Sequence, residues 1–477
     1  MELWLSQFAV ASAEIFILVM VAVVMMVDLI LSHEHRWITY GLSQATLVVA
    51  AILTWQHWNQ PAQTVFDGQY VMDNFAVLTK EFVYLMGFGV FIYSRLYLDE
   101  HRILKGEFYL LGLLSLTGAL VLISGASMLT LYLGLELLSL PLYAMVSMRR
   151  DCAVSSEAAM KYFVLGSLAS GVFLYGLSLI YGMTHTIMLA QIMGQIPGAM
   201  VNQPVMIFAM VLLVAAIAFK LGAVPFHMWV PDVYEGAPTA VTAFVGSIPK
   251  LAAFALMIRL VFDALVQMMH QWMGLLTILA ILSLIIGNIL AVVQTNLKRL
   301  LGYSTIANVG FILLGLATGT LDGLHAALFY TLVYVLTAVA GFGILIILSR
   351  RGQEYENLAD LRGLNYRNSW LTLMLMLVLL SLAGIPPLVG FTAKLMIIRN
   401  LVNAQEYYLA GFALLMAVIG SYYYLKVIVA MYFEEPEVTE KPLVSVDGTL
   451  ALTVNSLLLL VLGFMPAVLL SLVLQVG

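Results

Sequence analysis

Residues 219–238 read FKLGAVPFHMWVPDVYEGAP, and this stretch decides how the rest of the chain is interpreted. It continues an apolar run from Val205 to Ala218 that contains no charged residue, so Lys220 is expected at membrane depth. Pro225 follows, and proline removes a backbone donor and clashes with the preceding turn, which predicts a break in the helix. In lipid, a broken helix survives only where protein or a water-filled cavity satisfies its free backbone groups.

His227 lies about two helical turns beyond Lys220, on the same side of the helix. An ammonium beside a helix break, with a histidine next in line, is typical of an ion pathway. The simpler interpretation is a kinked helix whose lysine extends to the membrane surface. A lysine at the centre of a spanning helix costs about 2.5–3.5 kcal/mol, and this cost favours the ion pathway.

The composition predicts an all-α polytopic membrane protein. Of the 477 residues, 62% are hydrophobic and 10% are charged, whereas a soluble domain carries about 25% charged residues. The net charge of −5 is small and spread out, which indicates no nucleic-acid partner. The single cysteine, Cys152, excludes an intrachain disulfide and a cysteine-ligated cluster. The N-terminus has no basic region, so we expect no cleaved signal peptide.

Windows of about twenty apolar residues predict about fourteen spanning helices. They fall at 8–31, 37–55, 75–96, 108–123, 128–148, 158–183, 205–230, 239–262, 272–293, 300–316, 324–348, 370–398, 409–432 and 449–474. A second interrupted helix is predicted at Leu382–Lys394, where glycine, proline and lysine recur in an apolar run. Paired interrupted helices are typical of transporter repeats.

The predicted helices divide the chain into four regions. Three helices occupy 1–107, two five-helix repeats occupy 108–263 and 270–433, and a last helix occupies 434–477. The two repeats begin an odd number of helices apart, so they should be inverted relative to each other, each with one broken helix.

Basic residues gather in alternate loops. They follow the odd-numbered predicted helices, whereas loops such as 59–71 and 184–204 carry almost none. By the positive-inside rule the odd-numbered helices end in the cytoplasm, and both chain termini face the outer side. The basic residues behind this prediction are Arg36, Arg95, Arg102, Lys105, Arg149, Arg150, Lys298, Arg299, Arg350, Arg351, Arg362, Arg367 and Lys441.

Further ionisable residues fall inside predicted helices, namely Glu136, Lys161, Lys250 and Lys394. Such residues mark proton relays more often than they face lipid. Burial favours release of a lysine's proton and a nearby carboxylate favours its retention, so a moving carboxylate can switch a lysine between the two states. For Lys161, near a helix start, an ordinary helix-end lysine is an equal alternative.

Other ionisable residues are weaker candidates. His325 begins the eleventh predicted helix and could line the path. Lys80 and Glu81 are adjacent in the third helix and point apart, so we assign them no role. The sequence has no GxxxxGK[ST] loop, no C-x-x-C pair and no GxGxxG after a strand, which indicates ion chemistry without a redox centre or metal site in this chain.

Five segments carry a family resemblance. They read LGLELLSLPLY (133–143), SEAAMKYF (156–163), the opening stretch (219–238), QTNLKRLLGYSTIA (294–307) and LSLAGIPPLVGFTAK (380–394). Here the sequence resembles the antiporter-like membrane subunits of proton-pumping NADH:quinone oxidoreductase, respiratory complex I. The resemblance implies that Glu136 and Lys220 form an ion pair, that Lys161 and Lys250 belong to a central hydrophilic axis, that His227 bridges, and that Lys394 ends the axis.

Of the three paralogous types in this family, the N type is the most similar, because it has a lysine at the position of Lys394 and a short C-terminus. Some relatives have a histidine where this chain has Asn308, so water is expected to replace that link. The resemblance implies quinone, NADH, FMN and iron–sulfur clusters in partner subunits, and none in this chain. It also implies M-type and K-type membrane neighbours, a lipid bilayer, and the bacterial inner membrane.

Two alternatives remain open. A subunit of a multi-subunit sodium/proton antiporter would share the fold, but sodium transport calls for clustered oxygen ligands at membrane depth, and Glu136 is the one clear central carboxylate. A non-pumping scaffold of the membrane arm would gain nothing from several buried charges. The sequence therefore favours proton relay.

Overall fold

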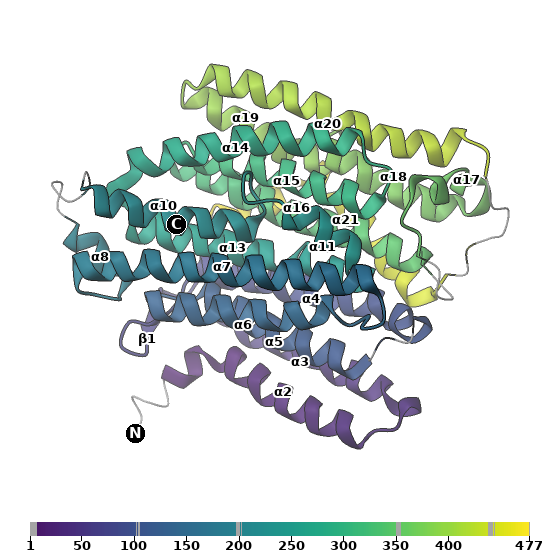
Figure 1. Ribbon diagram of the computed structural model, residues 1–477, viewed down its shortest axis with the longest axis horizontal. Coiled ribbons are helices and arrows are strands. Elements are labelled where there is room, and N and C mark those ends of the chain that lie inside the picture. Colours follow the sequence, from purple (N-terminus) through teal and green to yellow (C-terminus); the bar gives the residue numbers. More distant parts are fainter. Residues whose placement is uncertain are drawn as a thin grey trace.

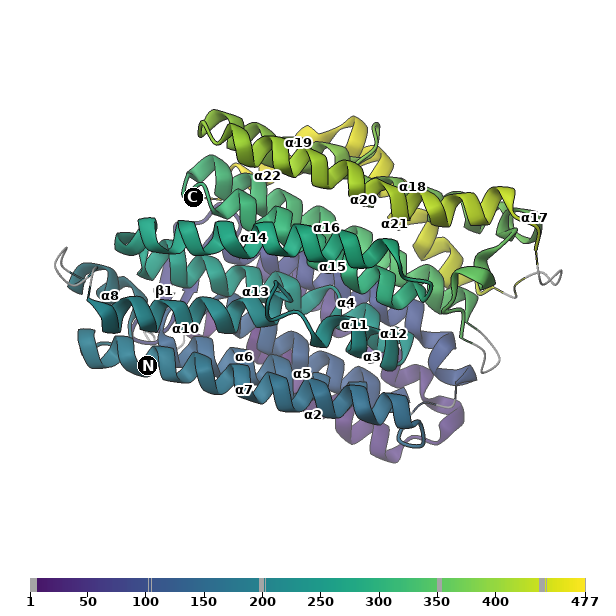
Figure 2. The ribbon, with the colours of Figure 1, turned by 45° about the horizontal axis from the view of Figure 1, so that its top comes forward.

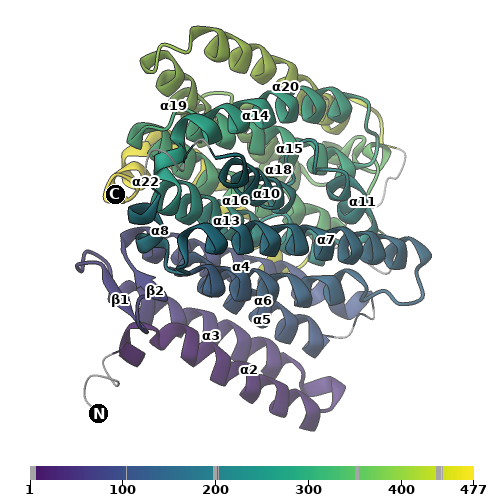
Figure 3. The ribbon, with the colours of Figure 1, turned by 60° about the vertical axis from the view of Figure 1, so that its left-hand side comes forward.

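Nearly parallel helices make up the part of the chain that the computed structural model describes, namely residues 7–101, 103, 105–196, 201, 203–349, 354–436, 442 and 444–476. Helices α2 and α3 lie at one edge of the bundle and α20 lies at the opposite edge (Figures 1 and 3). Among the described residues, thirteen helices are long and apolar enough to cross a membrane. A discontinuous helix, α18–α19, supplies a further crossing, so the prediction of an all-α polytopic protein is confirmed.

The N-terminal region contains a short β-hairpin as well as helices. Its elements are α2 (Ser12–Ile30), η1 (His33–His35), α3 (Trp37–Trp55), β1 (Gln63–Val65), β2 (Tyr70–Met72) and α4 (Asn74–Glu100). The two strands are antiparallel, with Gln63 opposite Met72 and Val65 opposite Tyr70.

The next region carries the first broken helix. Its elements are α5 (Lys105–Ile123), α6 (Met128–Val146), α7 (Ala153–Thr184), α8 (Leu189–Gln195), α10 (Pro204–Leu221), α11 (Trp229–Gly236), α12 (Thr239–Val245), α13 (Ile248–Ile258), η2 (Arg259–Ala264) and η3 (Val266–Met268). Helices α10 and α11 are the two halves of the helix that Pro225 was predicted to break, and that prediction is confirmed.

The second half of the chain carries another broken helix. Its elements are α14 (Met269–Val292), α15 (Leu297–Leu316), α16 (Leu321–Leu348), η4 (Leu358–Leu361), α17 (Leu364–Arg367), α18 (Ser369–Ala383), α19 (Val389–Asn403), α20 (Tyr407–Phe433), α21 (Val446–Phe464) and α22 (Pro466–Val473). The continuous segment predicted at 239–262 is also interrupted, at Gly246 and Ser247 between α12 and α13, which corrects that prediction.

Two pairs of neighbouring helices, α5 with α6 and α14 with α15, pack closely in the same way, because each pair has a glycine at the contact. A Cβ on Gly118 of α5 would meet the backbone of Leu138 in α6, and a Cβ on Gly287 of α14 would meet the backbone of Ala307 in α15. Each contact joins the first helix of a predicted repeat to the second. This likeness supports the two repeats, whereas the predicted domain boundaries stay a prediction.

The two ends of the bundle differ. The hairpin end carries β1 and β2, and there Tyr70 bonds Glu14 at 2.9 Å while Asn74 donates to the carbonyl of Gln475 at 3.0 Å. Helix α2 therefore begins, and the described chain ends, at the same end of the bundle (Figure 2). We call the opposite end, which carries Arg149 and Arg299, the basic end. The basic residues Arg102, Arg350, Arg351 and Lys441 lie outside the described residues.

Candidate functional site

The first break places a buried lysine at the end of a half-helix. Gly222 follows the last residue of α10 with φ +83°, a left-handed conformation that suits glycine, and its N–H bonds back to Ala218 at 2.9 Å. The last carbonyls of a helix have no partner within the helix. Lys250, at the start of α13 and fully buried, donates to the carbonyls of Lys220 at 3.2 Å and Leu221 at 2.8 Å.

The second break repeats this arrangement. Gly384 follows α18 with φ +80°, and its N–H bonds back to Leu380 at 3.1 Å. Lys394, on α19 and 7% exposed, donates to the carbonyls of Leu382 at 2.8 Å and Ala383 at 3.0 Å. A cation at a helix C-terminus is also favoured by the helix dipole. The last carbonyls of both half-helices, α10 and α18, therefore bind the ammonium group of a lysine at membrane depth.

Lys220 is held by hydroxyl groups of α6. Its Nζ atom donates to Ser139 at 2.7 Å and to Tyr143 at 3.4 Å, and its side chain is buried. Glu136 lies one turn before Ser139 on the same helix, and its Oε1 atom is buried without a hydrogen-bond partner among the described residues. In the described structure Lys220 binds Ser139 and forms no ion pair with Glu136, and the predicted Glu136–Lys220 pair stays a prediction.

A small cavity of about 10 Å³, lined by several polar side chains, adjoins Lys394. Asn308 lines it, accepts a hydrogen bond from Tyr330 at 2.7 Å, and donates to the carbonyl of Ser304 at 2.8 Å. The hydroxyl of Ser381, which also lines the cavity, is buried without a partner in the described structure. Buried polar groups of this kind are commonly satisfied by water. Asn308, which takes the place of a histidine found in some relatives, therefore lies beside a site for the water that the sequence predicts there.

Tyr334 joins this cavity to the break in the helix that carries Lys250. The residue lines the cavity, and its hydroxyl donates to Thr305 at 2.8 Å and also approaches the carbonyl of Gly246 at 3.3 Å. Lys250 lies one turn beyond Gly246. The polar groups around Lys250 and Lys394 are thus connected through α16, and sequence analysis did not identify Tyr334.

The other two predicted site residues make no hydrogen bond to Lys220, Lys250 or Lys394 in the described structure. His227 is in the linker between α10 and α11, and its Nδ1 atom is buried without a hydrogen-bond partner in the part of the chain described here. Lys161 is 43% exposed and pairs with Glu157 at 2.9 Å and with Asp232 of α11 at 2.7 Å. The structure therefore gives His227 no bridging contact and places Lys161 at the surface of this chain, and the proposed roles of both stay predictions.

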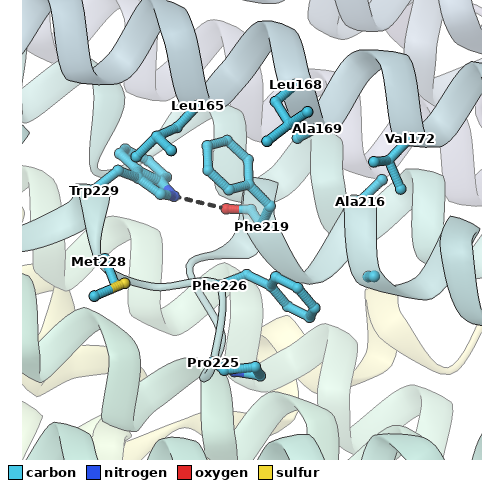
Figure 4. A pocket seen from close by; sticks show the side chains of 11 residues that line it. Leu165, Leu168, Ala169, Val172, Ala216, Phe219, Pro225, Phe226, Met228 and Trp229 are labelled. Carbon is cyan, nitrogen blue, oxygen red and sulfur yellow. Dashed lines mark hydrogen bonds between the residues drawn. The ribbon is translucent and has the colours of Figure 1, made fainter.

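An apolar pocket of about 230 Å³ flanks the first break, and Figure 4 shows its side chains. Trp229 forms one wall, and its Nε1 atom donates to the carbonyl of Phe219 at 2.9 Å. The Nζ atom of Lys250 lies 4.8 Å from the centre of the same ring. Trp229 therefore separates the buried ammonium from the pocket, whose lining is Leu165, Leu168, Ala169, Val172, Ala215, Ala216, Phe219, Pro225, Phe226, Met228 and Trp229.

Comparison with known proteins decides the family. Residues 125–420 match a family model described as NADH:quinone oxidoreductase/Mrp antiporter, TM. NADH-quinone oxidoreductase subunit N of Thioalkalivibrio sulfidiphilus (strain HL-EbGR7) is 50% identical over 462 residues, which cover 96% of each chain. The chain belongs to the NADH-quinone oxidoreductase subunit N family. The resemblance seen in the sequence is thus confirmed.

Solved structures agree with membership of the subunit N family. A chain of respiratory complex I from Thermus thermophilus with bound Aureothin is 31% identical, with a TM-score of 0.83 and coverage of 98% of this chain and 100% of that one. A chain of the Mrp complex from Dietzia sp. DQ12-45-1b has a TM-score of 0.82 at 22% identity, covering 98% of this chain and 96% of that one. The second likeness shows a shared fold alone.

This member of the subunit N family also carries a buried charge cluster that sequence analysis missed. Lys80 is fully buried and forms an ion pair with Glu14, and it donates to Tyr70 at 2.8 Å. At the same end, Arg259 of η2 binds Asp73 through two hydrogen bonds of 2.8 and 2.9 Å. The expectation that Lys80 has no role is therefore wrong as far as structure is concerned, because its ion pair with Glu14 joins α4 to α2.

Proposed function

We propose that this chain translocates protons as a membrane subunit of NADH:quinone oxidoreductase, through Glu136, Lys161, Lys220, His227, Lys250 and Lys394. The observation that carries the proposal is that the last carbonyls of two half-helices each bind a buried lysine, Lys250 at the end of α10 and Lys394 at the end of α18. A buried ammonium is costly at membrane depth and is retained where it serves ion movement. Neutral carbonyls, rather than carboxylates, receive both ammonium groups in the described structure.

In this proposal Lys220 alternates between Ser139 and Glu136. On Ser139 it has neutral partners, and near Glu136 its proton is stabilised by the carboxylate. The backbone carbonyl of Lys220 binds Lys250 at 3.2 Å, so movement at the end of α10 alters the surroundings of both lysines. Tyr334 and the cavity beside Asn308 then supply the polar connection towards Lys394.

Quinone reduction takes place elsewhere in the proposed complex. NADH, FMN, iron–sulfur clusters and quinone are held by partner subunits, and M-type and K-type membrane subunits are the proposed neighbours. We place the chain in the bacterial inner membrane with the hairpin end, and so both termini, on the outer side. The basic loops of the sequence support this orientation.

Substitution of Lys250 tests the relay. We expect Lys250→Ala to lose proton pumping, and Lys250→Arg to lose it as well, because arginine keeps its proton near neutral pH. Proton uptake by inverted membrane vesicles is measured beside NADH:quinone reductase activity and the amount of assembled complex. Full pumping by an assembled Lys250→Arg variant would remove this residue from the relay. Pumping that requires sodium would instead favour the antiporter alternative.

Cysteine labelling tests the orientation. In a Cys152→Ser background, single cysteines at Ala62, directly before β1, and at Asp151 near the basic end should react with an impermeant maleimide from opposite sides. We expect Ala62→Cys to label in intact spheroplasts and Asp151→Cys only in inverted vesicles. Labelling of both from one side would contradict the helix count, and the reversed pattern would contradict the orientation.

A further inference from the structure

Glu354 gathers several polar groups at the basic end of the bundle. Its carboxylate accepts hydrogen bonds from Tyr97 and Arg149, and a third from the hydroxyl of Thr239 at 2.9 Å. The imidazole of His101 lies 3.8 Å from the same carboxylate. Glu354 remains 13% exposed, so one face of this group is open towards the end of the bundle. It is thus a carboxylate in contact both with the surface and with the first residue of α12.

Helix α12 leads from this carboxylate to the break beside Lys250. It begins at Thr239 and ends at Val245, directly before Gly246. The hydroxyl of Thr242, halfway along it, donates to the carbonyl of Tyr234 at 3.0 Å. Both threonines are buried. Two buried hydroxyl groups therefore lie along this short helix between Glu354 and Gly246.

Tyr234 places a hydroxyl at the inner end of this line. The side chain is fully buried, and its hydroxyl makes no close hydrogen bond in the described structure, with Thr305 as its polar neighbour. The oxygen lies 3.4 Å from where a Cβ on Gly246 would be, and Tyr334 reaches the carbonyl of the same glycine at 3.3 Å. Two tyrosine hydroxyls from α11 and α16 thus converge on the break. An unpaired buried hydroxyl costs about 1–3 kcal/mol and calls for an explanation.

We propose that protons reach Lys250 from the basic end through an inlet formed by Glu354, Thr239, Tyr234 and Tyr334. This inlet rests on the proton translocation proposed above and adds residues to it. Glu354 collects the proton, and water at the break supplies the partner that the hydroxyl of Tyr234 otherwise lacks. The hydroxyl of Tyr334 continues the path towards the cavity beside Lys394.

The transfer needs no change in the charge of either tyrosine. Each hydroxyl accepts a proton on a lone pair while it gives its own proton to the next oxygen, so the bond made and the bond broken balance at every step. Lys250, when neutral, takes the last proton on its amine. The oxygens involved are those of Glu354, Thr239, the two tyrosines and the intervening water.

A purely structural role for these groups makes a different prediction. Glu354 could serve only to hold the loop after α16 against α4 and α12, through Tyr97, Arg149 and Thr239. Tyr234 would then fill space with its ring, which packs on Phe342 at 5.7 Å between centroids. On that view, removal of the tyrosine hydroxyl leaves every described hydrogen bond intact.

Tyr234→Phe is therefore the decisive variant, and Tyr93→Phe is its matched control. Tyr93, on α4, also has a buried hydroxyl without a close hydrogen bond in the described structure, and its polar neighbour is Asn455 of α21 rather than a group of the inlet. Proton uptake per quinone reduced is measured in vesicles for both variants, and for Lys250→Ala. We expect Tyr234→Phe to lower proton uptake by on the order of tenfold or more, because a proton-transfer group is lost. Tyr93→Phe should leave proton uptake unchanged.

Glu354 supplies the second test. We expect Glu354→Gln to lower pumping and Glu354→Asp to restore most of it, with assembly unchanged in both. Normal pumping by Tyr234→Phe and Glu354→Gln, with no pumping by Lys250→Ala, would overturn the inlet and leave the relay standing. Normal pumping by Lys250→Ala would overturn the relay itself, and the inlet with it.

Discussion

Ser139→Ala should disturb the switch at Lys220 without changing any charge. The hydroxyl of Ser139 is buried and accepts the proton of Lys220 at 2.7 Å, whereas the other acceptor, Tyr143, lies at 3.4 Å. Glu136 is one turn away, with a buried oxygen that has no partner among the residues described. Removal of the hydroxyl leaves Tyr143 as the remaining hydrogen-bond partner of Lys220, and the carboxylate of Glu136 is the stronger acceptor on the same helix.

The size of this effect follows from the hydrogen bond that is lost. A hydrogen bond to a charged group is worth about 1.5–3 kcal/mol. Since about 1.4 kcal/mol corresponds to a tenfold change in an equilibrium, the ratio of Ser139-bound to Glu136-paired Lys220 should fall about ten- to a hundredfold. A lysine held on Glu136 keeps its proton, so turnover of the relay should slow while the complex still assembles.

The assay compares Ser139→Ala with Ser115→Ala in inverted vesicles. Ser115 lies on α5, is fully buried, and donates to the carbonyl of Leu138 at 2.9 Å, so it controls for the loss of a buried hydroxyl in the same region. We expect proton uptake and coupled quinone reduction to fall only in the Ser139 variant. Equal rates in the two variants would refute the switch, as would a structure of Ser139→Ala in which Lys220 stays apart from Glu136.

Two further predictions concern the same lysines. Gly384→Ala places a Cβ 2.7 Å from the side chain of Lys394 and forces alanine to φ +80°, at a cost of about 1–2 kcal/mol, so we expect lower pumping and a lower midpoint of thermal unfolding; Gly171→Ala, with open space around it, is the control, and equal behaviour of the two would contradict the assigned geometry. Glu136→Ala and Lys220→Ala should each impair quinone reductase activity, and the double variant should lose less than the sum, because neither charge is then left alone; strictly additive losses would show that they do not act together.

The spanning helices were predictable because a bilayer sets a simple requirement of about twenty apolar residues. Both discontinuous helices were also predicted, since Pro225 and the Gly384–Pro387 run fall inside apolar segments, where proline removes a backbone donor and clashes with the preceding turn. The interruption at Gly246 was missed. Pro249, the nearest proline, lies in the first turn of α13, where proline is compatible with a continuing helix and gives no signal of the break before it.

The buried lysines were predictable as residues, but their partners were not. An ammonium at membrane depth stands out in a sequence because of its cost. The acceptors of Lys250 and Lys394 are backbone carbonyls, which every residue carries, so no residue type marks them. For Lys80 the partner is identifiable by type, but Glu14 lies 66 residues away, and only the packing of α2 on the start of α4 brings the two together.

The two breaks differ in how their lysines are attached, and this difference has a consequence for movement. Lys394 belongs to α19, which continues the same discontinuous helix whose first half it binds, so the short linker after Gly384 restrains the contact. Lys250 belongs to a separate helix and directly follows its own interruption at Gly246 and Ser247. A shift at that interruption can change the contact between Lys250 and α10 while α10 stays in place. At the first break, therefore, movement of a separate helix can change the contact of the lysine. Such a movement would pivot at Gly246, the residue that the hydroxyl groups of Tyr234 and Tyr334 both approach.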